Sequence, residues 1–268
     1  MTPAWTTDAA TSDPARAVHL TLFWGLDGVA LRTLGGARVP EITEGPLRRR
    51  LDESDLPVVA VEPGLFEGPA ARRAQWLNDV DRLTEVAAFG RRVGCGLVRV
   101  GALAGGPDGF DAEAAAGALR QAGARAEAEG LRLAVRNEAG TGVATGAALA
   151  ELLAEVAHAA VGADWRPAEA LAAGEDPADG LAALLGAGVP LVCVGVRDGV
   201  VAGADWDEAV VGEGAVDWAG QLAAIAGSGF EGPLVIDALP DPPRSTGLAS
   251  GTALVRLARR ARRDAGRG

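Results

Sequence analysis

The sequence predicts an α/β protein built as a single (β/α)8 TIM barrel, and three observations support this fold class. Short runs rich in Val, Leu and Ile alternate eight times with longer Ala-, Leu-, Arg- and Glu-rich runs of helical period. The length of 268 residues suits one such barrel. No linker rich in Pro, Gly and Ser divides the chain, so we expect one domain over residues 1–268.

Each expected strand is a short apolar run followed by a helical one. The strands are expected at 4–7, 28–34, 56–62, 96–102, 131–137, 161–164, 190–196 and 233–238. The helices are expected at 13–24, 43–53, 70–93, 111–129, 145–160, 176–186, 216–227 and 247–263. Patterning is weakest in the first strand.

Helix boundaries carry their own signals. Asp13 and Asp176 each precede a proline, which favours an N-cap followed by proline in the first turn. Gly94, Gly130 and Gly229 each stand shortly before a strand, where glycine can end a helix in the left-handed conformation. The repeated strand–helix units therefore follow one common pattern of helix ends and strands.

Composition limits the chemistry and the partners. The chain has no Lys, no Tyr and two His, which excludes a Schiff-base lysine, a phenolic acid and a three-histidine metal centre. A net charge of −11 argues against nucleic acid or an anionic membrane as a partner. No apolar run approaches the roughly 20 residues of a membrane span. We expect a cytoplasmic protein whose partner is a small molecule or another protein, with homo-oligomers left open.

Two local features have plain structural interpretations. Cys95 and Cys193 lie in apolar strand-like segments, which favours buried free thiols over a disulfide or a nucleophile. Residues 140–146 read GTGVATG and loosely resemble a dinucleotide-binding loop, but the glycine spacing differs. We interpret this segment as a strand-to-helix loop that ends in an N-cap at Thr145.

Charged and aromatic residues follow the expected strands, where barrels place their active sites. The candidate catalytic residues are carboxylates that could move protons: Glu62, Glu138, Asp164 and Asp237. The candidate ligand-binding residues are Arg32, Arg99, Arg136, Trp165 and Arg197. Arginines at this place favour an anionic ligand.

Four segments resemble the xylose isomerase-like barrel family of sugar-phosphate isomerases and epimerases. They are GLDGVALRTLGG (25–36), AAFGRRVGCGLVRVGA (87–102), GLRLAVRNEAGT (130–141) and VGEGAVDWAGQLAAIAGSGFEGPLVIDAL (211–239). The resemblance implies a divalent metal, such as Mn, Zn or Mg, held by Glu, Asp, His and Glu at the ends of strands five to eight. Such a metal polarises a carbonyl or hydroxyl while carboxylates move the proton.

The sequence departs from that ligand set at most positions. Arg136 stands where the resemblance implies the first Glu, and Gly195 where it implies the His. Asp164 remains, and Asp237 replaces the last Glu. We therefore expect no metal cofactor, with weak Mg or Mn binding at Asp164 and Asp237 as the alternative. The charges suggest instead that the Arg136 guanidinium bridges Asp164 and Asp237.

Two functions follow as hypotheses. One is a divergent isomerase or epimerase, or a lyase, that acts on a small anionic sugar or sugar acid without the metal. The other is a non-catalytic barrel that binds a ligand or depends on a partner protein. The sequence separates them poorly.

Overall fold

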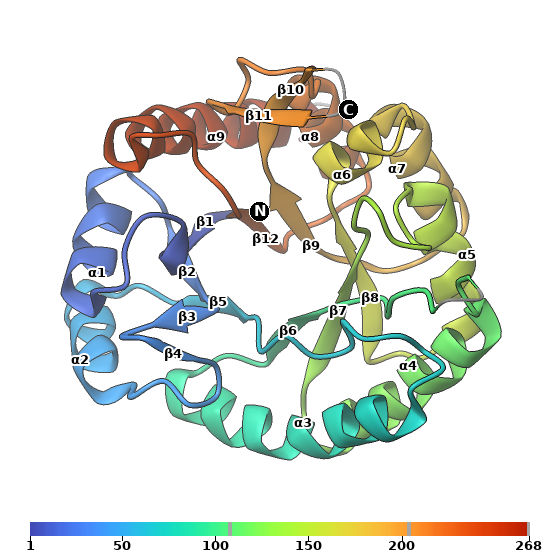
Figure 1. Cartoon of the computed structure of the whole chain (residues 1–268). Coiled ribbons are helices and arrows are strands. Elements are labelled where there is room, and N and C mark those ends of the chain that lie inside the picture. The colour runs from blue at the N-terminus through green and yellow to red at the C-terminus, as the bar shows by residue number, and fades with distance from the viewer. Residues whose placement is uncertain (107–108, 203–204, 267–268) are drawn as a thin grey trace. The chain divides into compact units, whose positions relative to one another are not determined.

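The computed structural model describes residues 1–106, 109–202 and 205–266, and it confirms the predicted fold class. Eight parallel strands follow one another in the closed order β1-β12-β9-β8-β7-β6-β5-β2, which is that of a (β/α)8 barrel (Figure 1). The chain packs as two compact units. We call Met1–Val59 with Cys193–Gly268 the terminal unit and Ala60–Val192 the central unit. The expectation of one domain over 1–268 stays a prediction.

The terminal unit contains the strands from the first and last parts of the chain. Its strands are β1 (Thr2–Thr6), β2 (Gly28–Leu31), most of β9 (Leu191–Val196) and β12 (Pro233–Ile236), and β1 pairs in parallel with β2 and β12. Its helices are the short η1 (Thr7–Ala9), α1 (Pro14–Phe23), α2 (Gly45–Ser54), α8 (Trp218–Gly227) and α9 (Pro243–Ala265). Two antiparallel hairpins complete it, β3 (Thr33–Leu34) with β4 (Ala37–Arg38) and β10 (Asp198–Ala202) with β11 (Asp205–Ala209).

The central unit alternates strands and helices regularly. Its strands are β6 (Leu97–Val100), β7 (Arg132–Arg136) and β8 (Val161–Trp165), and β5 (Val58–Val61) enters it at Ala60. Its helices are α3 (Arg73–Val93), α4 (Ala112–Ala128), α5 (Gly146–Val156), α6 (Pro167–Ala172) and α7 (Pro177–Gly186). Parallel ladders join β5 to β6, β6 to β7 and β7 to β8. The carboxyl ends of these strands therefore lie at one edge of the sheet.

The predicted capping residues are confirmed. Asp13 Oδ1 accepts a hydrogen bond from the Arg16 amide at 2.7 Å, and Asp176 Oδ1 accepts one from the Ala178 amide at 2.9 Å. Thr145 Oγ1 caps α5 through the Ala148 amide, as expected. Gly94 follows α3 with φ of 72°, the left-handed conformation that glycine adopts without strain.

Four features differ from the sequence prediction. The helix expected at 145–160 ends at Val156 because Ala157 turns into the left-handed region with φ of 44°. Helix α6 is an unpredicted short element between β8 and α7, and it begins at Pro167. The strand expected at 28–34 ends at Leu31, and Thr33–Leu34 pairs in a hairpin with β4 instead. The hairpin of β10 and β11 extends the loop after β9, where the alternation of strand and helix gives no sign of extra strands.

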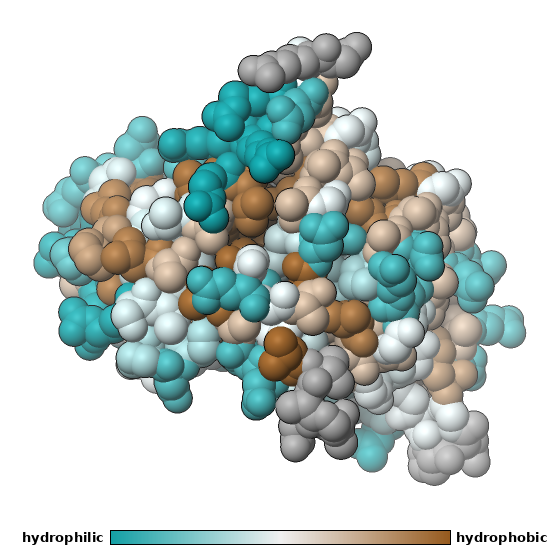
Figure 2. Space-filling view, turned by 90° about the horizontal axis from the view of Figure 1, so that it is seen from above, coloured by the Kyte–Doolittle hydropathy of each residue, from teal (hydrophilic) through white to brown (hydrophobic). Residues whose placement is uncertain are grey.

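The described residues also bear on the cysteines and on the surface. Cys95 and Cys193 are buried free thiols, as predicted, and burial raises the pKa of Cys95 to about 11. Within the described residues, no helix is both long and apolar enough to cross a bilayer. Hydrophobic and hydrophilic residues are interspersed over the face that Figure 2 shows.

Gly247 tests how closely α9 packs in the terminal unit. An added Cβ at Gly247 would overlap the Trp24 ring, whereas one at Gly117 in α4 would meet nothing within 4 Å. We expect Gly247→Ala to lower the free energy of unfolding by about 1–3 kcal/mol through overpacking. The control Gly117→Ala should raise it by roughly 0.5–1 kcal/mol through helix propensity. Urea unfolding measures both, and equal effects would contradict the packing.

Candidate functional site

Arg99 in β6 is the most deeply buried cation of the central unit. Its register partner is Ala134 of β7, whose partner in turn is Gly162 of β8. Register partners in a parallel sheet point to the same face, so the small Ala134 side chain leaves room beside Arg99. An added Cβ at Gly162 would instead meet Val192 and the Pro190 carbonyl. Arg99 is 0% exposed. A guanidinium without solvent needs carboxylate partners.

One partner comes from β8, two strands away, and the other directly follows β5, the neighbouring strand on the opposite side. Arg99 Nε donates to Asp164 Oδ2 of β8 at 2.8 Å, and Arg99 Nη1 lies 3.6 Å from Glu62 Oε2, directly after β5. Both carboxylates are buried. Arg166 Nη2 lies 3.5 Å from the same Asp164 oxygen. The other oxygen, Asp164 Oδ1, is buried and accepts no hydrogen bond from any described residue.

Arg136, the last residue of β7, continues the network. Its guanidinium lies 3.5 Å from Glu62 Oε1, donates to Glu67 at 2.9 Å and donates to Glu138 at 3.0 Å. Burial alone would lower the pKa of Arg136, but the charge of Glu62, the hydrogen bond to Glu67 and the charge of Glu138 together raise it. Arg136 is therefore a permanent cation.

We call Glu62, Glu67, Arg99, Arg136, Glu138, Asp164 and Arg166 the arginine–carboxylate cluster. Its three arginines and four carboxylates carry a net formal charge of −1. The cluster has a buried end and an accessible end. The side chains of Asp164 and Arg99 are 0% exposed, whereas those of Glu67 and Glu138 are 41% and 47% exposed. A dissolved ligand would thus meet the glutamates of Arg136 first.

The loop after β5 is held by a buried acid of α3. Asp79 Oδ2 accepts a hydrogen bond from the Phe66 amide at 2.9 Å, and burial raises the pKa of Asp79. Phe66 has φ of 59°, which a side chain rarely adopts unless its surroundings impose it. The amides of Gly101 and Leu103 donate to the Leu65 and Phe66 carbonyls at 3.0 and 2.8 Å. The loop between Glu62 and Glu67 is therefore fixed.

The next two loops are also tied together by side chains. Asn137, which is 0% exposed, accepts from the Arg166 amide and donates to the Ala144 and Arg166 carbonyls. Glu175 accepts from the Gly146 and Ala147 amides at the start of α5. The helix terminus that residues 140–146 lead into is thus capped by the chain's own carboxylate and by Thr145.

The remaining charged candidates lie in the terminal unit, each with a partner of its own. Arg32 forms a two-oxygen contact with Asp8 at 2.9 Å, and Thr6 Oγ1 donates to Asp237 Oδ1 at 3.1 Å. Arg197 donates to Glu208 at 2.6 Å, and its guanidinium lies 5.2 Å from the centre of the Trp206 ring. The arginines are therefore engaged by carboxylates in this unit too.

Two expectations need correction. The predicted bridge from Arg136 to Asp164 is wrong, because Arg99 takes Asp164 and Arg136 pairs with glutamates. A ring at Trp165 was expected to bind ligand, but it is 0% exposed and a Cβ on Gly180 of α7 would lie 2.8 Å from it. Side chains alternate along a strand, so Trp165 points away from the Asp164 side. It packs the core between β8 and α7.

Sequence reasoning missed the carboxylates that pair with the predicted arginines. Glu67 pairs with Arg136, Asp8 with Arg32 and Glu208 with Arg197. Glu67 lies in a loop, Asp8 in η1 and Glu208 in the unpredicted hairpin, and none of these positions follows an expected strand directly. The available signal was the number of arginines expected at the strand ends, because a buried arginine needs a carboxylate nearby.

The cluster does not fit the divalent cation that the resemblance implies. Among residues 1–106, 109–202 and 205–266, no three or more His, Cys, Asp or Glu side chains are arranged to hold a metal. The carboxylates of the cluster lie within 3.6 Å of guanidinium nitrogens instead. A divalent ion there would have to displace or repel fixed positive charges.

The buried pair of Arg99 and Asp164 yields a stability prediction. Arg99→Met should lower the free energy of unfolding by about 3–5 kcal/mol, because two carboxylates stay buried without their cation. Arg120→Met removes an arginine whose side chain is 48% exposed and pairs with Glu155, and it should change stability by about 1 kcal/mol or less. Denaturant unfolding compares the two. A small effect of Arg99→Met would mean that the pair is dispensable.

Comparisons with known proteins place the fold. A family model described as xylose isomerase-like TIM barrel matches residues 20–257. No match is found among curated proteins. A xylose isomerase-like TIM barrel/4-hydroxyphenylpyruvate dioxygenase fusion protein is 22% identical to this chain, with a TM-score of 0.81. The alignment covers 100% of this chain and 44% of the fusion protein, so this chain spans less than half of that protein.

Other similar structures match along their whole length. An L-ribulose 3-epimerase is 16% identical, with a TM-score of 0.78 and coverage of 99% of this chain and 97% of that one. A probable 3-DHS dehydratase from Bacillus anthracis is 13% identical, with a TM-score of 0.76 and coverage of 95% and 99%. These likenesses show the shared fold. The match of the family model over most of the chain shows that the protein belongs to the xylose isomerase-like TIM barrel family.

Proposed function

We propose that the protein binds and acts on a small anionic sugar or sugar acid at the carboxyl ends of β5 to β8, as a divergent isomerase- or epimerase-like enzyme without a divalent metal. The observation that carries the proposal is the Arg136 guanidinium. It is a permanent cation whose two outer partners, Glu67 and Glu138, are half-exposed. A carboxylate or phosphate of a ligand can replace these glutamates, because it offers the same charge in the same geometry.

The carboxylates of the cluster supply the proton chemistry in this proposal. Glu62 and Glu138 are the candidate bases, and Glu138 would be released from Arg136 when the ligand binds. The guanidinium then faces the negative charge that develops on a ligand oxygen as a proton leaves the neighbouring carbon. Asp164 is fully buried, so in this proposal it holds Arg99 in place rather than contacting the ligand. An epimerase and a lyase share the initial proton removal, so both reaction types fit this arrangement.

One observation favours the second candidate, a non-catalytic barrel that binds a ligand or depends on a partner protein. The arginines of the cluster already have carboxylate partners within the central unit. Such a network is stable without a bound substrate, as expected of a barrel that is not catalytic.

The test is a thermal-shift titration in metal-free buffer with EDTA, using sugar phosphates, sugar acids and keto acids with neutral sugars as controls. An anionic ligand at about 100 times its dissociation constant should stabilise the protein by about 2.7 kcal/mol. Arg136→Gln should abolish that gain. Glu138→Gln should tighten binding by up to about tenfold, or 1.4 kcal/mol, because it removes the competing carboxylate.

Glu151→Gln is the matched control, since Glu151 is an exposed residue of α5 outside the cluster. Equal affinities of the Glu138→Gln and Glu151→Gln variants, or no response to any anion, would refute the site. Incorporation of deuterium from D2O into a bound ligand separates the two candidates, because only an enzyme that removes a proton exchanges it.

A further inference from the structure

Arg136 shares one edge of its guanidinium between two acids. Its Nε donates to Glu138 Oε2 at 3.0 Å, and its Nη2 donates to Glu67 Oε1 at 2.9 Å. These two nitrogens form an edge on which a guanidinium can bind both oxygens of one carboxylate. Arg32 uses its edge in that way, because its Nε and Nη2 both contact the single carboxylate of Asp8 at 2.9 to 3.1 Å. One ligand carboxylate can therefore take the place of both glutamates on Arg136.

Backbone amides, which phosphate sites use as donors in loops and at helix N-termini, are already engaged at two places in the fold. Three amides of the segment 212–216 donate to the buried Asp198 carboxylate at 2.7 to 3.2 Å. The first amides of α5 donate to Glu175 at 2.6 and 3.2 Å. In both places a carboxylate of the chain itself holds the position that a phosphate would need.

The charge of the cluster sets a second limit on the ligand. The cluster carries −1 before a ligand binds, and the loop that carries Glu67 is fixed, so this acid stays near Arg136 after it is displaced. The other two arginines of the cluster already lie 2.8 and 3.5 Å from Asp164. A ligand carboxylate adds one negative charge, whereas a phosphate ester adds about two near neutral pH. The second charge would be repelled by the acids around it.

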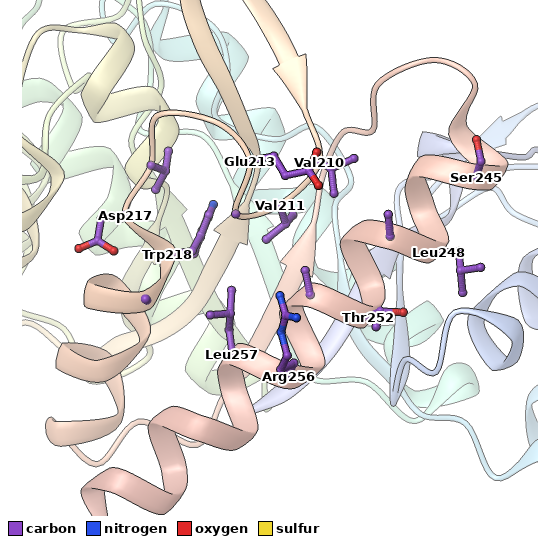
Figure 3. Close-up of a pocket in the computed structure, with 15 residues that line it drawn as sticks. Val210, Val211, Glu213, Asp217, Trp218, Ser245, Leu248, Thr252, Arg256 and Leu257 are labelled. Atoms are coloured by element: carbon purple, nitrogen blue, oxygen red, sulfur yellow. The ribbon is translucent and has the colours of Figure 1, made fainter.

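A groove of about 500 Å³ between α8, α9 and the loop 210–217 is a poor site for an anion by comparison (Figure 3). Glu213 and Asp217 line it together with Arg256, so the acids outnumber this one cation. Arg256 is also exposed, and water weakens its attraction for an anion. A small anion is therefore expected at Arg136 rather than in this groove.

We propose that the cluster selects a carboxylate over a phosphate, so that the ligand is a sugar acid or a related hydroxy acid rather than a sugar phosphate. This assignment rests on the function proposed above and narrows its class of ligand. The ligand carboxylate takes both Nε and Nη2 of Arg136, and Glu67 and Glu138 leave together. Glu62, which lies 3.5 Å from Nη1, keeps its place at the other end of the guanidinium.

Glycolate and methyl phosphate are the probes, at about pH 8, where glycolate carries one negative charge and methyl phosphate about two. The readout is the Arg136 Nε–H signal of the 15N-labelled protein, which its loss in Arg136→Gln identifies. Glycolate in the millimolar range should move this signal. Methyl phosphate should bind about tenfold more weakly, and the neutral ethylene glycol should leave the signal in place.

Glu67→Gln and Glu138→Gln should each tighten glycolate binding by roughly threefold or more, because each variant removes one of the two competing charges. Glu151→Gln is the matched control and should leave the affinity unchanged, since Glu151 is exposed on α5 outside the cluster. Arg256→Gln should also leave it unchanged, because the anion does not bind in the groove.

Two kinds of result are distinguished by this experiment. Methyl phosphate that binds as tightly as glycolate, or a gain in only one of the two cluster variants, would overturn the carboxylate assignment and still leave an anion site at Arg136. No response to either anion, or a response that Arg256→Gln abolishes, would refute the proposed function and this assignment with it.

Discussion

The central unit depends on keeping charges of opposite sign next to one another where water is excluded. From Asp164 the order runs through Arg99, Glu62 and Arg136 to the outer glutamates, with ion-pair distances of 2.8 to 3.6 Å. Each member alone would be too costly to bury. The alternation joins β5, β6, β7 and β8 through side chains, in addition to their backbone ladders. It also places the positive charge of Arg136 where the sequence resemblance implies a carboxylate.

A small residue and a fixed loop beside the network are part of the same constraint. Ala134, the register partner of Arg99, has a small side chain, and the loop after β5 is fixed by Asp79 so that Glu62 and Glu67 reach Arg136. The proposed function depends on how the exposure of the side chains changes along the cluster. The buried pair of Arg99 and Asp164 gives rigidity, and the half-exposed glutamates give a place where a ligand anion can compete.

The sequence predicted the eight parallel strands and the principal helices because apolar periodicity and end signals such as Asp13, Asp176 and Gly94 act locally. It also predicted that Glu62, Arg99, Arg136, Glu138 and Asp164 belong together, since the carboxyl ends of neighbouring parallel strands meet at one edge. It did not predict which arginine pairs with which acid. Arg136 and Asp164 are register partners, yet Arg99 reaches Asp164 from two residues lower in the sheet, and that choice depends on side-chain length and on the loop that carries Glu67.

In the proposed site, guanidinium charge rather than a divalent ion balances the carboxylates of the cluster. Thermal unfolding of the wild type and of Arg136→Glu in metal-free buffer, with and without millimolar Mn2+, tests this charge balance. The substitution changes the formal charge of the cluster from −1 to −3, so the variant should be less stable without metal and should recover in part when Mn2+ is added. The wild type should not respond to Mn2+. A rise in the wild-type melting temperature as large as that of the variant would contradict the account.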